Sequence, residues 1–399
     1  MTLYESLKLF ERNEQLKFSR QLGLGIKELD FYNNEHILPE DSILNTIESV
    51  TGYSKVQIML KMRIIDSDLL KSFEENAEII SDLLGKGHNR INLPQKSDIP
   101  QPTLATNLGS LYEIDCLELL KSIDSNTIDM IFADPPFNLD KFYASQINDN
   151  LDYEKYIKWS YSWIDECVRV LKPGGSIFIW NLPKWGGIYS TYLQQRLCFK
   201  HWISVDIKYR LPINKRLYPS HYSLLYFVKG ATPNVFKPDR LPMATCPKCF
   251  NEIKDYGGYK NKMNPNGINL SDVWYDIPPV RHSKYKNREE ANELSIKLLD
   301  RIIEMSTNEG DIVLDPFGGS GTTFVVSEIK NRRWIGCEIG PTETIVNRFS
   351  RINNEEMYLK SIRESYNKLF TDNVKQKRMS LGLWTDETFN QPNSEELSK

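Results

Sequence analysis

Two short loops decide the fold: Asp134-Pro135-Pro136-Phe137 and, far downstream, Asp315-Pro316-Phe317-Gly318-Gly319-Ser320-Gly321. Each loop follows an apolar run, at residues 129–133 and 311–314, that is typical of a buried strand. The second loop is rich in glycine, which lets a backbone approach a bound molecule closely. We therefore expect both loops to follow strands and to supply the functional residues.

Around both loops, predicted strands alternate with predicted helices. The motif Lys172-Pro173-Gly174-Gly175 is expected to stop a long helix that carries apolar residues at helical spacing. This alternation predicts an α/β fold with a mainly parallel sheet covered on both faces. The expected strands are 111–115, 129–133, 176–180, 202–209, 222–228, 311–314 and 334–338, and the expected helices are 117–123, 153–171, 291–306 and 322–329.

The chain has 399 residues, which exceeds one ordinary domain. The apolar spacing in residues 1–95 predicts a small helical N-terminal domain. A polar connector at 92–101 leads to a larger domain at 105–355, which holds both loops and is the expected catalytic domain. Within the first part, Leu29 to Met62 resembles half of a phage-repressor-like helix-turn-helix domain, and DNA binding and a packing or oligomerisation role both stay open. We expect an insert at 229–270, and a C-terminal helix with a disordered polar tail at 356–399.

Composition places the chain among soluble globular proteins, with 40% hydrophobic and 26% charged residues. No apolar run is long enough to cross a membrane and the start lacks the pattern of a signal peptide, so we expect a cytoplasmic location. The six cysteines are scattered, which predicts reduced thiols. The formal net charge of −3 gives no global attraction to nucleic acid, so any contact with DNA would have to come from local basic patches.

The Asp-Pro-Pro-Phe loop suits a flat molecule that carries an amino group. The lone pair of an exocyclic amine on adenine or cytosine is delocalised into the ring, and two fixed hydrogen-bond acceptors would localise it. Asp134 supplies one acceptor and the Pro135 carbonyl the second, since Pro136 rigidifies the backbone. Phe137 can stack on the base, and a base in a duplex must be flipped to reach this loop. The alternative is a strand-end turn in which the prolines only break the chain.

The glycine-rich loop predicts a site for a nucleoside cofactor. It lacks the lysine after the glycines that a phosphate-binding P-loop needs. Glu338 ends the next predicted strand, where a carboxylate can accept hydrogen bonds from both ribose hydroxyls. A surface carboxylate without a ligand is the alternative for Glu338.

The order of these motifs resembles the beta group of DNA amino-methyltransferases, in which the catalytic half precedes the cofactor half. The resemblance covers roughly residues 108 to 352 and includes Leu171-Lys172-Pro173-Gly174-Gly175 and Asp272-Val273-Trp274. It implies a Rossmann-like, doubly wound methyltransferase fold, S-adenosylmethionine as cofactor, and a site-specific methylase of a bacterial restriction-modification system or an orphan one. A cognate restriction endonuclease would act separately, and a homodimer stays open.

Site residues follow from the resemblance position by position. Phe317, Gly319 and Gly321 would wrap the cofactor, and Asp315 would lie near its amino group. Asp115 would lie near the adenine of the cofactor, and Glu338 on its ribose. The segment 281–288, which precedes the predicted helix at 291–306, departs from the family pattern, so the resemblance assigns no cofactor contact there. The full predicted cofactor set is Asp115, Asp315, Phe317, Gly318, Gly319, Gly321, Thr322 and Glu338.

Double-stranded DNA is the expected substrate. Adenine is favoured over cytosine because the catalytic loop begins with Asp134, whereas cytosine-amino enzymes of this type commonly carry Ser there. N4-cytosine methylation is the first alternative, and a DNA-binding regulator with a methyltransferase-like domain is the second. The insert at 229–270 is the expected target-recognition region. The predicted DNA-binding residues are Lys208, Arg210, Lys215, Arg216, Arg281, Lys284, Lys286 and Arg288.

Cys246-Pro247-Lys248-Cys249 is half of a zinc motif. A second pair at suitable spacing is missing, and other ligands could join only through the fold. The sequence therefore predicts no metal among the site residues and leaves zinc at this pair open.

Overall fold

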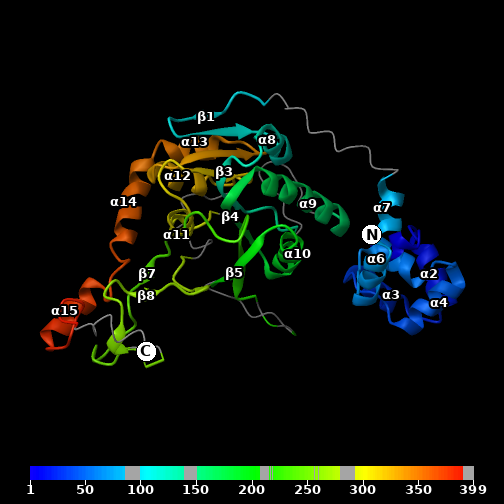
Figure 1. The fold of residues 1–399 in the computed structure, drawn as a ribbon, viewed down its shortest axis with the longest axis horizontal. Helices are drawn as coiled ribbons and strands as arrows, with labels where there is room; N and C mark the ends of the chain where they lie inside the picture. Colours follow the sequence, from blue (N-terminus) through cyan, green and yellow to red (C-terminus); the bar gives the residue numbers. More distant parts are fainter. Residues whose placement is uncertain are drawn as a thin grey trace. The chain divides into compact units, whose positions relative to one another are not determined.

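The computed structural model describes residues 1–85, 99–138, 151–206, 215, 217, 219–255, 257, 258, 260–278 and 293–389 (Figure 1). The chain splits into two compact units. The first comprises residues 1–95 with 152–157, and the second comprises 96–151 with 158–399. No helix in the described ranges is both long enough and apolar enough to span a bilayer.

The N-terminal unit is helical, as predicted. Its core is formed by buried side chains such as Leu29, Leu44 and Ile58. Gly52 ends α4 in the left-handed conformation (φ 73°), and Ser54 caps α5, so two helices follow each other through a tight turn. The helices are α1 (Leu3–Ser6), α2 (Arg12–Gln21), α3 (Ile26–Asn34), α4 (Asp41–Thr51), α5 (Lys55–Met62), α6 (Ser67–Glu75) and α7 (Ala77–Gly85).

The second unit is built on a mixed sheet with the strand order β1-β2-β11-β10-β3-β4-β6-β5-β9. The five strands from β2 to β4 in this order are parallel, and β6 is antiparallel to both of its neighbours. The strands are β1 (Leu104–Ala105), β2 (Gly109–Glu113), β3 (Ile128–Ala133), β4 (Leu171–Asn181), β5 (Cys198–Asp206), β6 (His221–Val228), β9 (Val273–Trp274), β10 (Ile312–Asp315) and β11 (Arg333–Glu338). The predicted α/β class with a mainly parallel sheet is confirmed.

Helices cover the sheet. One face packs against α11 (Ile296–Ser306), α12 (Thr322–Ile329) and α14 (Ile352–Arg363), in a core that includes Phe132, Phe178 and Phe324. The other helices of the sheet region are α8 (Cys116–Ser122), α9 (Tyr153–Val170), α10 (Pro183–Leu193) and α13 (Glu343–Phe349), of which α10 contacts β4 and β6. This two-sided cover leaves the strand ends as the place for a site.

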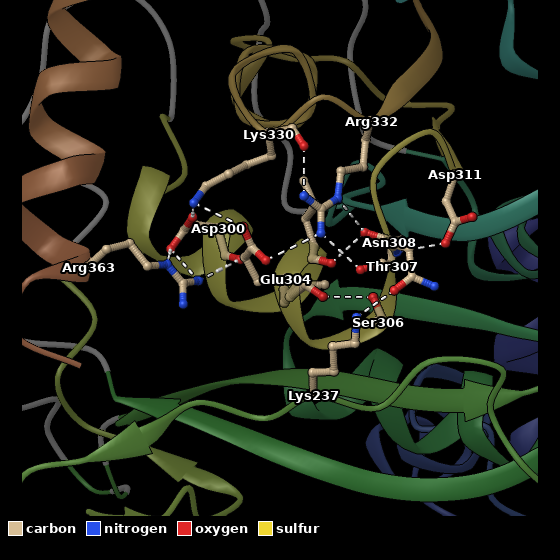
Figure 2. Close-up of polar contacts among 12 residues, drawn as sticks. Lys237, Asp300, Glu304, Ser306, Thr307, Asn308, Asp311, Lys330, Arg332 and Arg363 are labelled. Atoms are coloured by element: carbon tan, nitrogen blue, oxygen red, sulfur yellow. Dashed lines mark hydrogen bonds and ion pairs between the residues drawn. The ribbon is translucent and has the colours of Figure 1, made fainter. Parts of the chain in front are cut away.

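A buried ion-pair network joins the helices of one layer (Figure 2). Asp300 on α11 is fully buried and contacts Lys330 at 3.1 Å and Arg363 at 2.6 Å. Glu304, one turn later, contacts Lys330 and Arg332 at 3.0 and 3.3 Å. Removing one partner of a buried pair leaves an uncompensated charge, so this network fixes how α11 lies against α12 and α14.

The C-terminal region differs from the prediction. Residues up to 389 are folded: α15 (Asp372–Ser380) and Trp384 pack with the insert, where β7 (Arg240–Leu241), η1 (Lys260–Lys262) and β8 (Ile268–Asn269) lie. Arg378 is fully buried although its surroundings in sequence are polar. The polar tail was expected to be disordered beyond about Arg378, and it is instead folded up to residue 389. Residues 390–399 lie outside the described part.

Two smaller differences concern secondary structure. The sequence did not predict α10, whose first residue is Pro183. Strand β4 begins at Leu171, so Lys172-Pro173-Gly174-Gly175 lies inside the strand rather than between helix and strand. A register irregularity between Ile128 and Met130 on the neighbouring strand accommodates these residues.

Candidate functional site

The two loops singled out in the sequence lie at the same edge of the sheet. Strands β3 and β10 are parallel neighbours, with Ile131 opposite Leu314, and each loop starts at the carboxyl end of its strand. In open α/β sheets, ligands bind outside the carboxyl ends of the strands where the strand order reverses. The loops after β3 and β10 therefore form the candidate site.

The glycine-rich loop is shaped by contacts that exclude side chains. A Cβ on Gly318 would lie 2.9 Å from the Cys337 carbonyl oxygen, and one on Gly321 (φ 78°) would lie 2.6 Å from Ile345. Gly319 is different: it is exposed, and its nearest neighbour would be the Phe317 carbonyl oxygen at 3.8 Å. Gly318 and Gly321 therefore serve the fold, and Gly319 leaves open space above the loop.

Asp315 lies at the base of this loop. It is 2% exposed, accepts a hydrogen bond from Thr323 Oγ1 at 2.5 Å and another from the Phe317 N–H at 2.9 Å. Burial raises the pKa of Asp315 to about 7, against the opposing effect of these two donors. The carboxyl group is thus poised to change its charge near neutral pH.

Glu338 and Asp115 lie close to the glycine-rich loop through backbone contacts. Glu338 Oε2 accepts from the Gly319 N–H at 2.7 Å, and its Oε1 accepts from the Gly340 N–H at 3.1 Å. Asp115 caps α8 by accepting from the Leu117 N–H at 2.8 Å, while the adjacent Ile114 N–H donates to the Glu338 carbonyl oxygen at 3.1 Å. The structure brings these three predicted positions together, and their roles as ligands stay predictions.

Aromatic side chains from α9 surround Phe317. Its ring meets Trp159 and Trp163 edge-on, with centroid distances of 5.8 and 5.2 Å. The sequence identified both tryptophans only as a helical apolar stripe, because spacing along one helix cannot show which loop that helix faces.

The catalytic loop contacts α10 and β6. The Phe137 carbonyl oxygen accepts from Trp185 Nε1 at 2.8 Å, and the Phe137 ring lies 6.2 Å from that of Tyr222. Asn138, in the left-handed conformation at φ 52°, ends the described part of the loop. Asp134 and Phe137 are half-buried and Pro135 is buried. Trp185 was missed by the sequence, since α10 itself was missed; a proline at a helix start is the signal that could have found it.

Arg348 on α13 is a further residue that the sequence missed. Its Nη1 donates to the Ser320 carbonyl oxygen at 3.1 Å and to Thr322 Oγ1 at 2.7 Å. Its other nitrogens donate to Glu355 at 2.6 and 2.7 Å. The Thr322 hydroxyl, predicted to contact the cofactor, is therefore bonded within the protein.

Most predicted DNA-binding residues lie outside the described part of the chain: Lys208, Arg210, Arg216, Arg281, Lys284, Lys286 and Arg288. Lys215 is described and is exposed, with φ 60°. The grouping of these residues into one surface stays a prediction.

Comparisons with known proteins relate this chain to DNA methyltransferases. A family model described as DNA methylase matches residues 128–346. The Type II methyltransferase M.BamHI of Bacillus amyloliquefaciens is 50% identical over 384 residues, which cover 96% of this chain and 90% of that protein. The Type II methyltransferase M.HpaI of Haemophilus parainfluenzae is 34% identical over 227 residues, covering 56% of this chain and 68% of the relative. Among solved structures, PvuII DNA methyltransferase (cytosine-N4-specific) aligns with a TM-score of 0.46 and 20% identity, over 64% of this chain and 97% of that one.

Proposed function

The chain belongs to the DNA methylase family, as a beta-group DNA amino-methyltransferase of the restriction-modification type, and from this premise we propose that it methylates an exocyclic amino nitrogen of a base at a specific site in double-stranded DNA. The observation that carries the proposal is the adjacency of β3 and β10. This adjacency supports the proposal because the Asp134 loop and the glycine-rich loop start at neighbouring strand ends, so a base amine held at the first would lie beside a nucleoside cofactor bound at the second.

S-adenosylmethionine is the cofactor of this family, and the residues present fit it. The space above Gly319 is open, the Glu338 carboxylate is half-exposed at the next strand end, and the Phe317 ring offers an apolar wall. When bound, the cofactor supplies a methyl group on a sulfonium that leaves as a neutral thioether. We assign its binding to Asp115, Asp315, Phe317, Gly319 and Glu338, with Gly318, Gly321 and Thr322 shaping the loop that would lie against it.

The chain's own residues prepare the amine. Asp134 and the Pro135 carbonyl accept the two amino hydrogens, so the nitrogen becomes more pyramidal and its lone pair points away from the ring. As the nitrogen gains the methyl group it must lose a proton, and Asp134 is the nearest acceptor. Phe137 stacks on the flipped base, and Trp185 holds the Phe137 backbone in place.

Asp134 as the first residue of the catalytic loop favours adenine N6 as the methylated atom. N4 of cytosine is the second candidate, because the matched family includes enzymes of both types. The two bases present the same kind of planar amino group, so the loop chemistry serves either.

Nucleoside analysis tests the function and the base together. Genomic DNA from a host that lacks other methylases, with and without this gene expressed, is digested and examined by mass spectrometry. N6-methyldeoxyadenosine is expected. N4-methyldeoxycytidine would show that the methylated base is cytosine instead of adenine. The absence of both nucleosides, in a host that expresses the folded protein, would contradict the proposal. An Asp134→Ala chain serves as the control.

The remaining assignments rest on the same premise. The insert at 229–270 selects the target sequence, and the basic residues around Lys215 bind phosphates. A cognate endonuclease acts as a separate protein on the same site. The expected compartment is the cytoplasm, where bacterial DNA is found.

A further inference from the structure

The insert carries a short hairpin that methyl transfer does not use. Thr245 and Ile253 form an antiparallel bridge, and the Cys246 N–H donates to the Glu252 carbonyl oxygen at 2.9 Å. The Phe250 N–H donates back to the Cys246 carbonyl oxygen at 3.0 Å, which closes the turn. Two cysteines therefore lie on one tight turn, and an acidic residue lies on the returning arm.

Three side chains of this hairpin converge. One ligand atom from each of Cys246, Cys249 and Glu252 lies within 4.8 Å of the others. Ligand atoms bound tetrahedrally at 2.0–2.3 Å from zinc are about 3.3–3.8 Å apart. Side-chain rotation alone can bridge this difference, without a change in the hairpin.

The turn also directs backbone donors at one sulfur. Backbone N–H groups of Cys249 and Lys248 bond to Cys246. Groups that hydrogen-bond to a metal ligand hold it in the orientation that binding needs. By contrast, Cys116 and Cys337 are buried away from the hairpin and are suited to packing.

Residues of the C-terminal region contact the hairpin and fix its position. The Phe250 carbonyl oxygen accepts from Arg378 Nη1 at 2.5 Å. The guanidinium of Arg378 lies 4.5 Å from the Phe370 ring and 4.7 Å from the Trp384 ring. Ile253 packs against the small core of Met243, Leu369 and their neighbours. The ligand-bearing turn is thus fixed before any ion binds, which lowers the entropic cost of binding.

We propose that Cys246, Cys249 and Glu252 bind one thiophilic divalent cation of the zinc type. In the described part of the chain no fourth side chain joins the group. A water molecule can take the fourth position, as in zinc sites with three protein ligands. The ion crosslinks the turn to the returning arm and offsets the repulsion among two thiolates and a carboxylate. Its role is to order the insert, and it takes no part in methyl transfer.

Metal analysis of the full-length protein tests this site. After equilibration with zinc under reducing conditions and removal of free metal, elemental mass spectrometry should find about one zinc per chain. Cobalt(II) should give thiolate-to-cobalt charge-transfer absorption, which zinc abolishes by displacement. Cys246→Ser and Cys249→Ser should each reduce bound zinc to below about a tenth of that value.

Two further variants keep the test decisive. Glu252→Gln alters an exposed side chain that does not contribute to the core, and it should weaken zinc binding about tenfold or more, a loss similar to that for altered groups around other metal sites. Cys198→Ser, which removes a half-buried thiol outside the hairpin, should leave the zinc content unchanged. Substoichiometric zinc without cobalt charge transfer in the unaltered, reduced protein would overturn the proposal, as would equal zinc in the Cys246 and Cys198 variants.

Discussion

The N-terminal helical unit and the catalytic unit differ sharply in charge. Residues 1–85 hold 9 of the 50 basic and 15 of the 53 acidic residues, which leaves 41 basic and 38 acidic residues for the rest of the chain. The net charge of −3 therefore combines an acidic first part with a mildly basic remainder. A single number for the whole chain hides where DNA can bind.

Geometry and charge point in different directions in the N-terminal unit. Helices α4 and α5 follow each other through a tight turn, as helix-turn-helix motifs do, yet α5 exposes Val56 and Leu60. Lys55 is paired with Asp41 at 2.7 Å, and Lys61 Nζ donates to the Ser6 carbonyl oxygen at 2.9 Å. A recognition helix needs free polar groups for phosphates and base edges. These contacts favour the proposal that DNA binds to the catalytic unit.

The largest effect is expected at Asp134. Asp134→Ala should lower methyl transfer about 100- to 1000-fold, because it removes an acceptor that acts on the amine in the transition state. S-adenosylmethionine affinity, measured by calorimetry, should change little. The counterpart in the N-terminal unit is Asp66→Ala, which removes the cap of α6 and should leave turnover unchanged. Turnover of the Asp134 variant above a tenth of wild type would contradict the assignment.

A matched pair of glycines gives the next largest effect. Gly319→Leu should weaken cofactor binding roughly 10- to 100-fold, since the new side chain fills the space above the loop. Gly23→Leu is the control: both glycines have positive φ (51° and 68°) and no close neighbours. Both variants should lose similar stability in thermal unfolding, and only the first should lose cofactor. Equal affinities would place the cofactor elsewhere.

The two units should respond to pH with opposite sign. Asp315 has a pKa raised to about 7, so the folded state holds its proton more tightly than the unfolded state. Its contribution to the free energy of unfolding should fall by about 1 kcal/mol per pH unit between pH 4 and pH 7. Asp30 has a lowered pKa because of its bond to Arg12, so its contribution is lost only in acid.

Hydrogen exchange resolved by segment measures both trends. Asp315→Asn should flatten the pH dependence of the protection around β10, and Asp30→Asn should weaken α2 and α3 mainly above pH 4. The same slope for β10 in wild type and Asp315→Asn would show that this carboxyl group does not titrate as its burial requires.

The smallest effect concerns DNA affinity. Replacing Lys215 and Arg216 by Ala should lower affinity for all DNA sequences and flatten the salt dependence by up to about two units, roughly one for each lost phosphate contact. Lys27→Ala with Arg63→Ala, which removes two exposed cations of the N-terminal unit, should change neither quantity. A larger loss of affinity from the Lys27 and Arg63 replacements would show that DNA binds to the helices of the N-terminal unit.

Local sequence signals predicted many of the helices and strands of the sheet region. Residues Thr322–Ile329 form the helix expected after the glycine-rich loop, and β3 and β11 differ from the prediction by one residue at their starts. These elements begin or end at clear sequence signals, such as the glycines before α12. The sequence predicted that each loop follows a strand, and the pairing of β3 with β10 then brings both loops to one edge.

What the sequence missed depends on distant contacts. Arg378 looks like a surface residue in sequence, and it is buried because Phe370 and Trp384 enclose it. Arg348 lies beyond the glycine-rich loop, and only the packing of α13 brings it to Ser320. Helix α10 starts with Pro-Lys-Trp-Gly-Gly, a composition with weak helix propensity that tertiary packing overrides.

The strand order has a consequence for folding during synthesis. Gly109 on β2 pairs with Trp334 on β11, and Met130 on β3 pairs with Val313 on β10, so the centre of the sheet joins segments more than 180 residues apart. During synthesis, β2 and β3 leave the ribosome long before the strands that lie between them. Until β10 and β11 are made, β2 and β3 have unpaired edges. Contacts of such long range form slowly, and unpaired strand edges can pair incorrectly or aggregate. The glycine-rich loop at residues 315–321 therefore joins the sheet only long after β2 and β3 have been made, and a chain that stops before β10 would lack the middle of its sheet.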